Sequence, residues 1–129
     1  MKLYLSHDTK VSELKKSFQD HYPYLKIEFF RTRHSLGEGS TWNEMVPGSA
    51  TLIEVTGQLR EGEIEIKPGY KVFEVEQLFQ NSFGLPVQIF RKTRFSWIET
   101  TKTDHLNLKK QNDMGKENCH AIYDEEVLL

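Results

Sequence analysis

One apolar pattern occurs twice in this chain, and the repetition restricts the possible fold more than any other feature. The segment ELKKSFQDHYPYLKIEFFR (13–31) is similar to EVEQLFQNSFGLPVQIFR (74–91). Four apolar residues match four others 61 positions later: Val11, Leu14, Phe18 and Tyr22 with Val72, Val75, Phe79 and Phe83. Because the spacing i, i+3, i+7, i+11 lines one side of a helix, we expect two equivalent amphipathic helices.

Strands are expected on both sides of each helix. Alternating apolar residues in KLYLS (2–6) and EIEIK (63–67) predict half-buried strands before the helices. The segments IEFFR (27–31) and VQIFR (87–91), 60 positions apart, predict a strand after each helix. Pro23 and Gly84 occupy matching places and are expected to end the helices. A third strand in each half is predicted from TLIEVT (51–56) and SWIETT (96–101).

The predicted fold class is therefore α+β, with internal duplication of a β-α-β-β unit. Repeat 1 covers residues 1–57 and repeat 2 covers residues 61–102, and the first repeat carries an insertion at 32–50. Each half is expected to contain a three-stranded sheet segment with one amphipathic helix on one face. Because so small a unit buries its apolar face poorly, we expect the halves to pack together with pseudo-twofold symmetry.

The C-terminal part departs from the repeat. Thr103 or Asp104 is a candidate N-cap and Gly115 a candidate stop, which predicts a short helix over 103–114. We expect residues 1–115 to form a single domain. The segment 116–129 has no clear apolar period and is net acidic, so we expect a flexible tail.

Composition excludes several classes of protein. The net charge of −2 and the pI near 6.2 argue against a generally basic protein that coats DNA. The single cysteine, Cys119, excludes an intramolecular disulfide, and no apolar run approaches the roughly 20 residues of a membrane-spanning helix. Polar residues interrupt the first apolar residues at once, unlike a signal peptide. We therefore expect a cytoplasmic protein without a membrane partner.

The sequence contains no recognisable constellation for catalysis, metal binding or cofactor binding. The five histidines are scattered without metal-ligand spacing, and the GEGS segment (37–40) lacks the GK[ST] ending of a phosphate-binding loop. Cys119 and His120 are adjacent, which is not the arrangement by which a histidine activates a thiol. We therefore expect a non-enzymatic protein with no cofactor.

Basic and aromatic residues give the strongest indications of binding. The segments FRTRH (30–34) and FRKTRF (90–95) place cationic side chains at the ends of the two second strands, and a tryptophan lies in the insertion. The candidate binding residues are Arg31, Arg33, Trp42, Arg91, Lys92, Arg94 and Trp97.

Three functions are compatible with these residues. The leading hypothesis is a protein-interaction module or scaffold, either a monomer or a homodimer, with an unidentified protein partner. The alternative is single-stranded nucleic-acid binding through the basic hairpin tips and neighbouring aromatic rings. A second alternative is a small hydrolase or ligand-binding protein with a pocket between the two repeats.

The second half resembles a group of small uncharacterised bacterial proteins, chiefly from Bacteroidetes. The similarity covers roughly residues 72–116 and includes FGLPVQIFR (83–91), WIETT (97–101) and the polar segment around Gln111 and Asn112. No activity is established for that group, so the resemblance implies no catalytic or binding residues.

Overall fold

The protein is an α+β structure built from four α-helices, one 3-10 helix and six strands in the described part of the chain. The computed structural model describes the backbone of residues 1–34 and 41–128, and the side chains of residues 1–31 and 44–120. The elements are β1 (Lys2–Leu5), α1 (Val11–His21), β2 (Leu25–His34), β3 (Thr41–Met45), α2 (Leu52–Thr56), β4 (Gly62–Glu65), α3 (Val72–Phe83), β5 (Val87–Lys92), β6 (Trp97–Glu99), η1 (Thr101–Thr103) and α4 (Leu108–Leu128).

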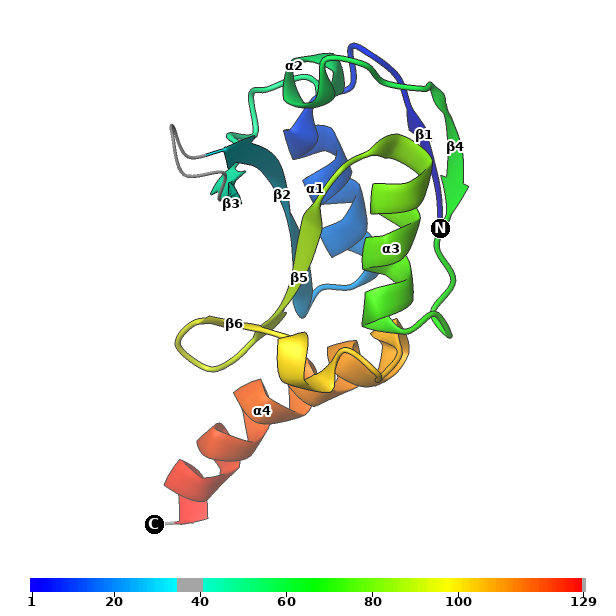
Figure 1. Cartoon of the computed structure of the whole chain (residues 1–129). Coiled ribbons are helices and arrows are strands. Elements are labelled where there is room, and N and C mark those ends of the chain that lie inside the picture. The colour runs from blue at the N-terminus through cyan, green and yellow to red at the C-terminus, as the bar shows by residue number, and fades with distance from the viewer. Residues whose placement is uncertain (35–40, 129) are drawn as a thin grey trace.

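The strands form two antiparallel sheets rather than the predicted three-stranded sheet in each half. One sheet pairs β1 with β4, and the other has the order β3-β2-β5-β6. Each sheet therefore combines strands from both halves of the sequence. Helices α1 and α3 lie between the two sheets (Figure 1). The apolar faces predicted for these helices are confirmed: Val11, Leu14, Phe18, Tyr22, Val72, Val75, Phe79 and Phe83 are all buried.

In both sheets, one residue pairs directly with the residue that corresponds to it in the other half. Leu3 pairs directly with Ile64 in the two-stranded sheet, and these residues are 61 positions apart. Glu28 pairs directly with Gln88 in the four-stranded sheet, at the offset of 60 positions. Antiparallel strands paired about corresponding residues have local twofold geometry, with the axis perpendicular to the sheet.

The third strand of the first half was assigned to the wrong residues. The segment 52–56 is helix α2, and the strand that pairs with β2 is β3, inside the predicted insertion. Leu52 and Val55 are both buried at the i, i+3 spacing of a helix, and Gly57 closes α2 with a left-handed φ of 73°. Over only five residues, the i, i+3 spacing of a helix resembles the alternation of apolar and polar residues in a strand.

The C-terminal helix is longer than predicted. Residues 108–128 form α4, so the helix predicted over 103–114 has the wrong bounds, and helix rather than an irregular tail continues to Leu128. Gly115 lies inside α4 and is buried. A Cβ atom at Gly115 would lie 2.8 Å from Cβ of Tyr24 and 3.1 Å from its carbonyl oxygen. This glycine therefore permits close packing and does not end the helix.

Among the described helices, none has the length and apolar character required to cross a bilayer.

Candidate nucleic-acid interface and the buried arginine

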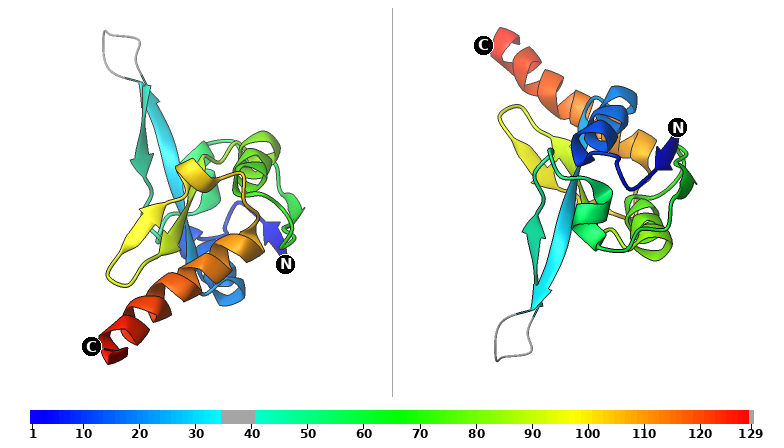
Figure 2. Two further views of the ribbon diagram at one scale, coloured as in Figure 1. Left: turned by 90° about the horizontal axis from the view of Figure 1, so that it is seen from below. Right: turned by 90° about the horizontal axis from the view of Figure 1, so that it is seen from above.

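The four-stranded sheet has one face packed against the core and one face without a helix over it in the described chain. Leu25, Ile27, Phe29 and Ile89 point toward α1 and α3 and are buried. Strand alternation places the neighbouring residues on the opposite side. Figure 2 shows that α1, α2 and α3 all lie on one side of these strands, while α4 runs past one end of them. We call the other side the open face; its residues are Lys26, Glu28, Phe30, Met45, Gln88, Phe90, Lys92, Trp97 and Glu99.

Antiparallel pairing brings two lysines onto the aromatic rings of the open face. Lys26 is opposite Phe90, and Lys92 is opposite Trp97. The Nζ atom of Lys26 lies 5.2 Å from the ring centroid of Phe90 and 5.3 Å from that of Trp97. The Nζ atom of Lys92 lies 5.0 Å from the Trp97 ring. These distances fall within the range of cation–π attraction, so cations and ring faces share one surface.

Glu28 belongs to the open face by strand alternation, and its charge is compensated. The Nζ atom of Lys15, on α1, is 3.0 Å from the Glu28 carboxylate, and that of Lys26 is 3.7 Å away. Glu28 itself is 5% exposed. Two ammonium groups around one covered carboxylate leave this part of the surface net positive.

The turn between β5 and β6 extends the aromatic surface. Thr93 and Ser96 close the turn, with the Thr93 amide donating to the Ser96 carbonyl over 2.8 Å. Phe95 at its tip is 86% exposed, and the Arg94 guanidinium lies 4.9 Å from its ring centroid. Arg94 and Phe95 thus form a further pair of a cation and an aromatic ring next to the open face.

Two of the predicted binding arginines are not exposed cations at hairpin tips. Arg31 and Arg91 lie on the core side of their strands, and Arg91 is only 8% exposed. The Nη1 atom of Arg91 donates to Oε1 of Gln111 over 2.8 Å, and Gln111 in turn donates to the Thr103 carbonyl over 2.7 Å. Arg91 therefore does not contribute to the exposed cationic surface that the sequence predicted.

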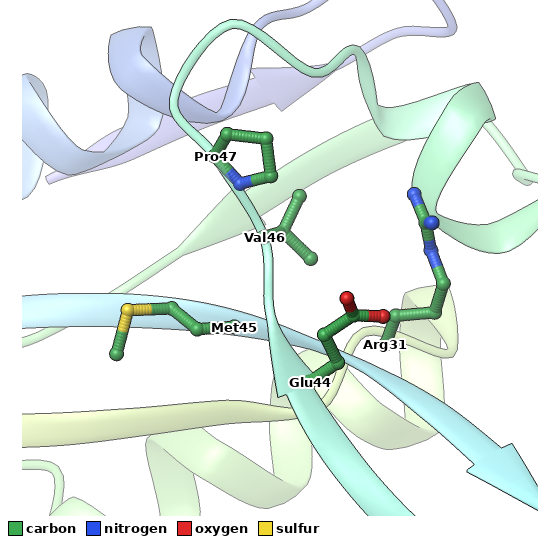
Figure 3. A pocket seen from close by; sticks show the side chains of 5 residues that line it. All are labelled: Arg31, Glu44, Met45, Val46 and Pro47. Carbon is green, nitrogen blue, oxygen red and sulfur yellow. The ribbon is translucent and has the colours of Figure 1, made fainter.

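Arg31 lines a small cavity with Glu44, Met45, Val46 and Pro47 (Figure 3). Arg31 and Glu44 are cross-strand partners, and their side chains lie next to each other in the figure. The Nη2 atom of Arg31 also donates a long hydrogen bond of 3.4 Å to the carbonyl of Glu54 on α2. The cavity has a volume of about 40 Å³, which is enough for about one water molecule but too small for an organic ligand.

The other predicted binding residues divide into two groups. Lys92 and Trp97 lie on the open face, and Arg94 lies in the adjacent turn. Arg33 and Trp42 are backbone partners in the β2–β3 ladder, but their side chains are outside the described residues. Sequence reasoning missed Lys26 and Phe90 as a pair because only the register of β2 against β5 brings them together.

A larger cavity lies between β5, β6 and η1. It has a volume of about 440 Å³ and is lined by Arg91, Ile98, Glu99, Thr101, Lys102 and Thr103. Ile98 is the cross-strand partner of Arg91 and is 40% exposed. None of these residues belongs to the first half, so this cavity does not lie between the halves.

Glu76 on α3 has an unusual proton affinity. Burial, together with the nearby charge of Asp104, raises the pKa of its carboxyl to about 7, while a hydrogen bond from the Ile89 backbone opposes the shift. The folded protein therefore binds a proton at Glu76 over a pH range in which the unfolded chain, with the usual pKa of 4.5, does not.

We expect Glu76→Gln to stabilise the protein above neutral pH. The ionised carboxylate costs no stability below pH 4.5, and the cost grows as pH rises to about 7 and is then constant. Because Glu76 is partly exposed, we expect a gain of about 1–2 kcal/mol at pH 8. Glutamine retains an acceptor for the Ile89 amide. Thermal unfolding of both proteins at the two ends of this pH range tests the prediction; an equal difference at both ends would contradict it.

Within the described residues, no group of three or more His, Cys, Asp or Glu side chains is arranged to hold a metal ion. Cys119 is a free, partly exposed thiol on α4.

No protein-family model matches the chain, and no curated protein or solved structure shows significant similarity to it. The resemblance of the second half to Bacteroidetes proteins therefore stays a prediction.

Proposed function

We propose that the protein binds single-stranded nucleic acid on the open face. The observation that carries this proposal is the cluster of Phe90 and Trp97 with Lys26 and Lys92, whose ammonium groups lie 5.0–5.3 Å from the ring centroids. Unpaired bases stack on aromatic side chains, and cationic side chains contact the phosphates between them. A sheet surface with both groups side by side supplies both interactions.

The positions of the rings support a strand that crosses the sheet. Phe30 and Phe90 lie two residues beyond Glu28 and Gln88, on neighbouring antiparallel strands. At about 3.3 Å per residue, their Cα atoms are separated by roughly 13 Å along the strand direction. Separate bases of one strand could therefore stack on Phe30 and Phe90, with Trp97 flanking Phe90 on the edge strand.

The distribution of charge favours an anionic ligand at this face although the whole chain carries a charge of −2. The charged residues on or beside the open face are Lys15, Lys26, Lys92, Arg94, Glu28 and Glu99. By contrast, the outward residues of the two-stranded sheet are Lys2, Tyr4, Glu63 and Glu65, all exposed. Cations are thus in excess on the open face and carboxylates on the opposite sheet, so a polyanion is steered toward the rings.

The salt dependence of binding tests the proposal. We expect fluorescence anisotropy of a labelled oligo-dT to show binding that weakens as salt rises. In the Lys26→Ala/Lys92→Ala double variant, the slope of log K against log salt should fall by about 1.4, since each phosphate contact on a single strand contributes about 0.7.

Lys2→Ala/Lys67→Ala is the matched control, because it removes two exposed lysines in or next to the two-stranded sheet. Equal slopes for the two double variants would exclude the open face as the phosphate-contacting surface.

A protein partner is the second candidate, as the sequence had suggested. Met45 and Phe95 are large apolar side chains exposed by 55% and 86%, and interfaces between proteins favour such residues. Under this proposal the open face is a protein-binding surface, and oligonucleotides do not bind even at low salt. Both candidates describe a binding function without catalysis.

We also infer that the chain arose by duplication of a β-α-β-β unit. The order β1-α1-β2-β3 in the first half matches β4-α3-β5-β6 in the second, with α2 between them. The direct pairing of the corresponding residues Leu3 with Ile64 and Glu28 with Gln88 supports this inference. Duplication would place Phe30 and Phe90 symmetrically on the open face, so that one ancestral ring became two.

A further inference from the structure

We propose that the cavity beside Arg91 binds a small molecule that carries an oxyanion, either a carboxylate or a phosphate. The cavity volume of about 440 Å³ lies within the range of about 300–1,000 Å³ that is usual for small-molecule sites. This proposal does not rest on nucleic-acid binding at the open face, since Arg91 lies on the other side of the sheet.

The first argument is the state of the Arg91 guanidinium. Arg91 is 8% exposed, yet no carboxylate of the described residues forms an ion pair with it. Its Nη1 atom donates to the neutral amide of Gln111 and, over 3.9 Å, to the Sδ atom of Met114, and its Nε atom is buried without a hydrogen-bond partner. A buried cation is costly unless an anion or several hydrogen bonds compensate it. A guanidinium group donates charge-assisted hydrogen bonds to carboxylates and phosphates, so an oxyanion in the cavity would compensate the charge of Arg91.

The second argument is that the guanidinium is held in place before any ligand binds. Gln111 is fully buried, and its Nε2 atom donates to the carbonyl oxygen and Oγ1 of Thr103 over 2.7 and 2.9 Å. Its Oε1 atom accepts from Arg91 over 2.8 Å. Gln111 therefore links α4, η1 and β5, and it acts as a positioning residue for Arg91.

The third argument is the chemistry of the cavity lining. Lys102 adds a second cation, Thr101 and Thr103 add hydroxyl groups, and Ile98 adds an apolar wall. Glu99 is the one carboxylate among the six lining residues, so the lining has a net positive charge. A ligand with one oxyanion and a less polar body fits this combination better than a polyanion does.

Isothermal titration with adenosine monophosphate, adenosine, benzoate and inorganic phosphate tests the proposal. We expect benzoate or the nucleotide to bind and adenosine not to bind. Lys102→Ala, which changes an exposed residue, should weaken binding about tenfold, which corresponds to about one lost charge-assisted contact. Lys2→Ala on β1 should leave the affinity unchanged. Binding that is equal in all three proteins, or binding of adenosine as tight as that of its monophosphate, would overturn the proposal.

An NMR measurement addresses Arg91 without depending on its replacement. The Nε–H resonance of Arg91, assigned by its loss in Arg91→Lys, should shift on addition of the anion that binds, with the same affinity as the titration. No shift at saturation would also overturn the proposal.

A second pair of probes separates the two sources of such an anion. Oligo-dT with and without a 5′-phosphate should differ in affinity if the anion is the end of a nucleic-acid strand, and this difference should vanish in Lys102→Ala. Equal affinities together with binding of the small anions would assign the cavity to a free small molecule. Failure of all of these anions to bind would reject the site and leave the open-face proposal untouched.

Discussion

Replacing Phe90 and Trp97 together by alanine is expected to lower the affinity for oligo-dT by about 100-fold or more. Stacking of a base on an aromatic side chain contributes about 1–3 kcal/mol, and each 1.4 kcal/mol is a factor of about ten. Two stacking surfaces are lost in this variant, together with the rings that hold Lys26 and Lys92 in place. Anisotropy titration at one fixed salt concentration measures the change.

The fold should survive this double substitution, because both rings are partly exposed on the open face and neither belongs to the buried core. Tyr4→Ala is the control: Tyr4 is an aromatic residue, 64% exposed, on the sheet at the other side of the molecule. It should bind as the unmodified protein does. A double variant within about twofold of the control would remove the open face from consideration.

The largest loss of stability is expected for Gly115→Val. A Cβ atom at this position would meet the Tyr24 Cβ at 2.8 Å, the Tyr24 carbonyl oxygen at 3.1 Å and the Arg91 Cγ at 3.2 Å. Backbone and strand atoms cannot move aside without disturbing β2 and β5. Overpacking of this kind typically costs about 1–3 kcal/mol of stability. Replacing a glycine inside a helix by another residue gains at most about 1 kcal/mol in helix propensity, so the net effect is a loss.

We therefore expect the melting temperature of Gly115→Val to fall by roughly 5–10 °C. Gly115→Ala should give a smaller decrease, since it adds only the Cβ atom. Asn118→Val is the control, because it places the same β-branched residue at an exposed position of α4. If Gly115→Val has the same melting temperature as the control, α4 does not pack against Tyr24 as described.

The sequence was sufficient for the elements whose pattern is long and periodic. Helices α1 and α3 and the strands around them were predicted, because four apolar residues on one helix face and repeated alternation leave few other arrangements. Helix α2 was missed because five residues show little more than one turn. Strand β3 was missed because it occupied a segment that seemed to interrupt the repeat.

The candidate sites depended on contacts between distant segments. Lys92 and Trp97 were predicted from their local composition, but Lys26 joins them only through the register of β2 with β5. Arg91 was expected to be exposed, and its burial results from Gln111, 20 residues later on α4. Neither the strand register nor the docking of a C-terminal helix can be deduced from periodicity, because both depend on packing across the whole domain.

The most direct test of nucleic-acid binding uses the intrinsic fluorescence of Trp97. The chain has two tryptophans, so Trp42→Phe leaves Trp97 as the single one. We expect oligo-dT to quench its emission saturably, with the dissociation constant that anisotropy gives, and an abasic strand of the same length to quench it far less. Anisotropy binding without quenching of Trp97, or equal quenching by the abasic strand, would show that bases do not stack on the open face.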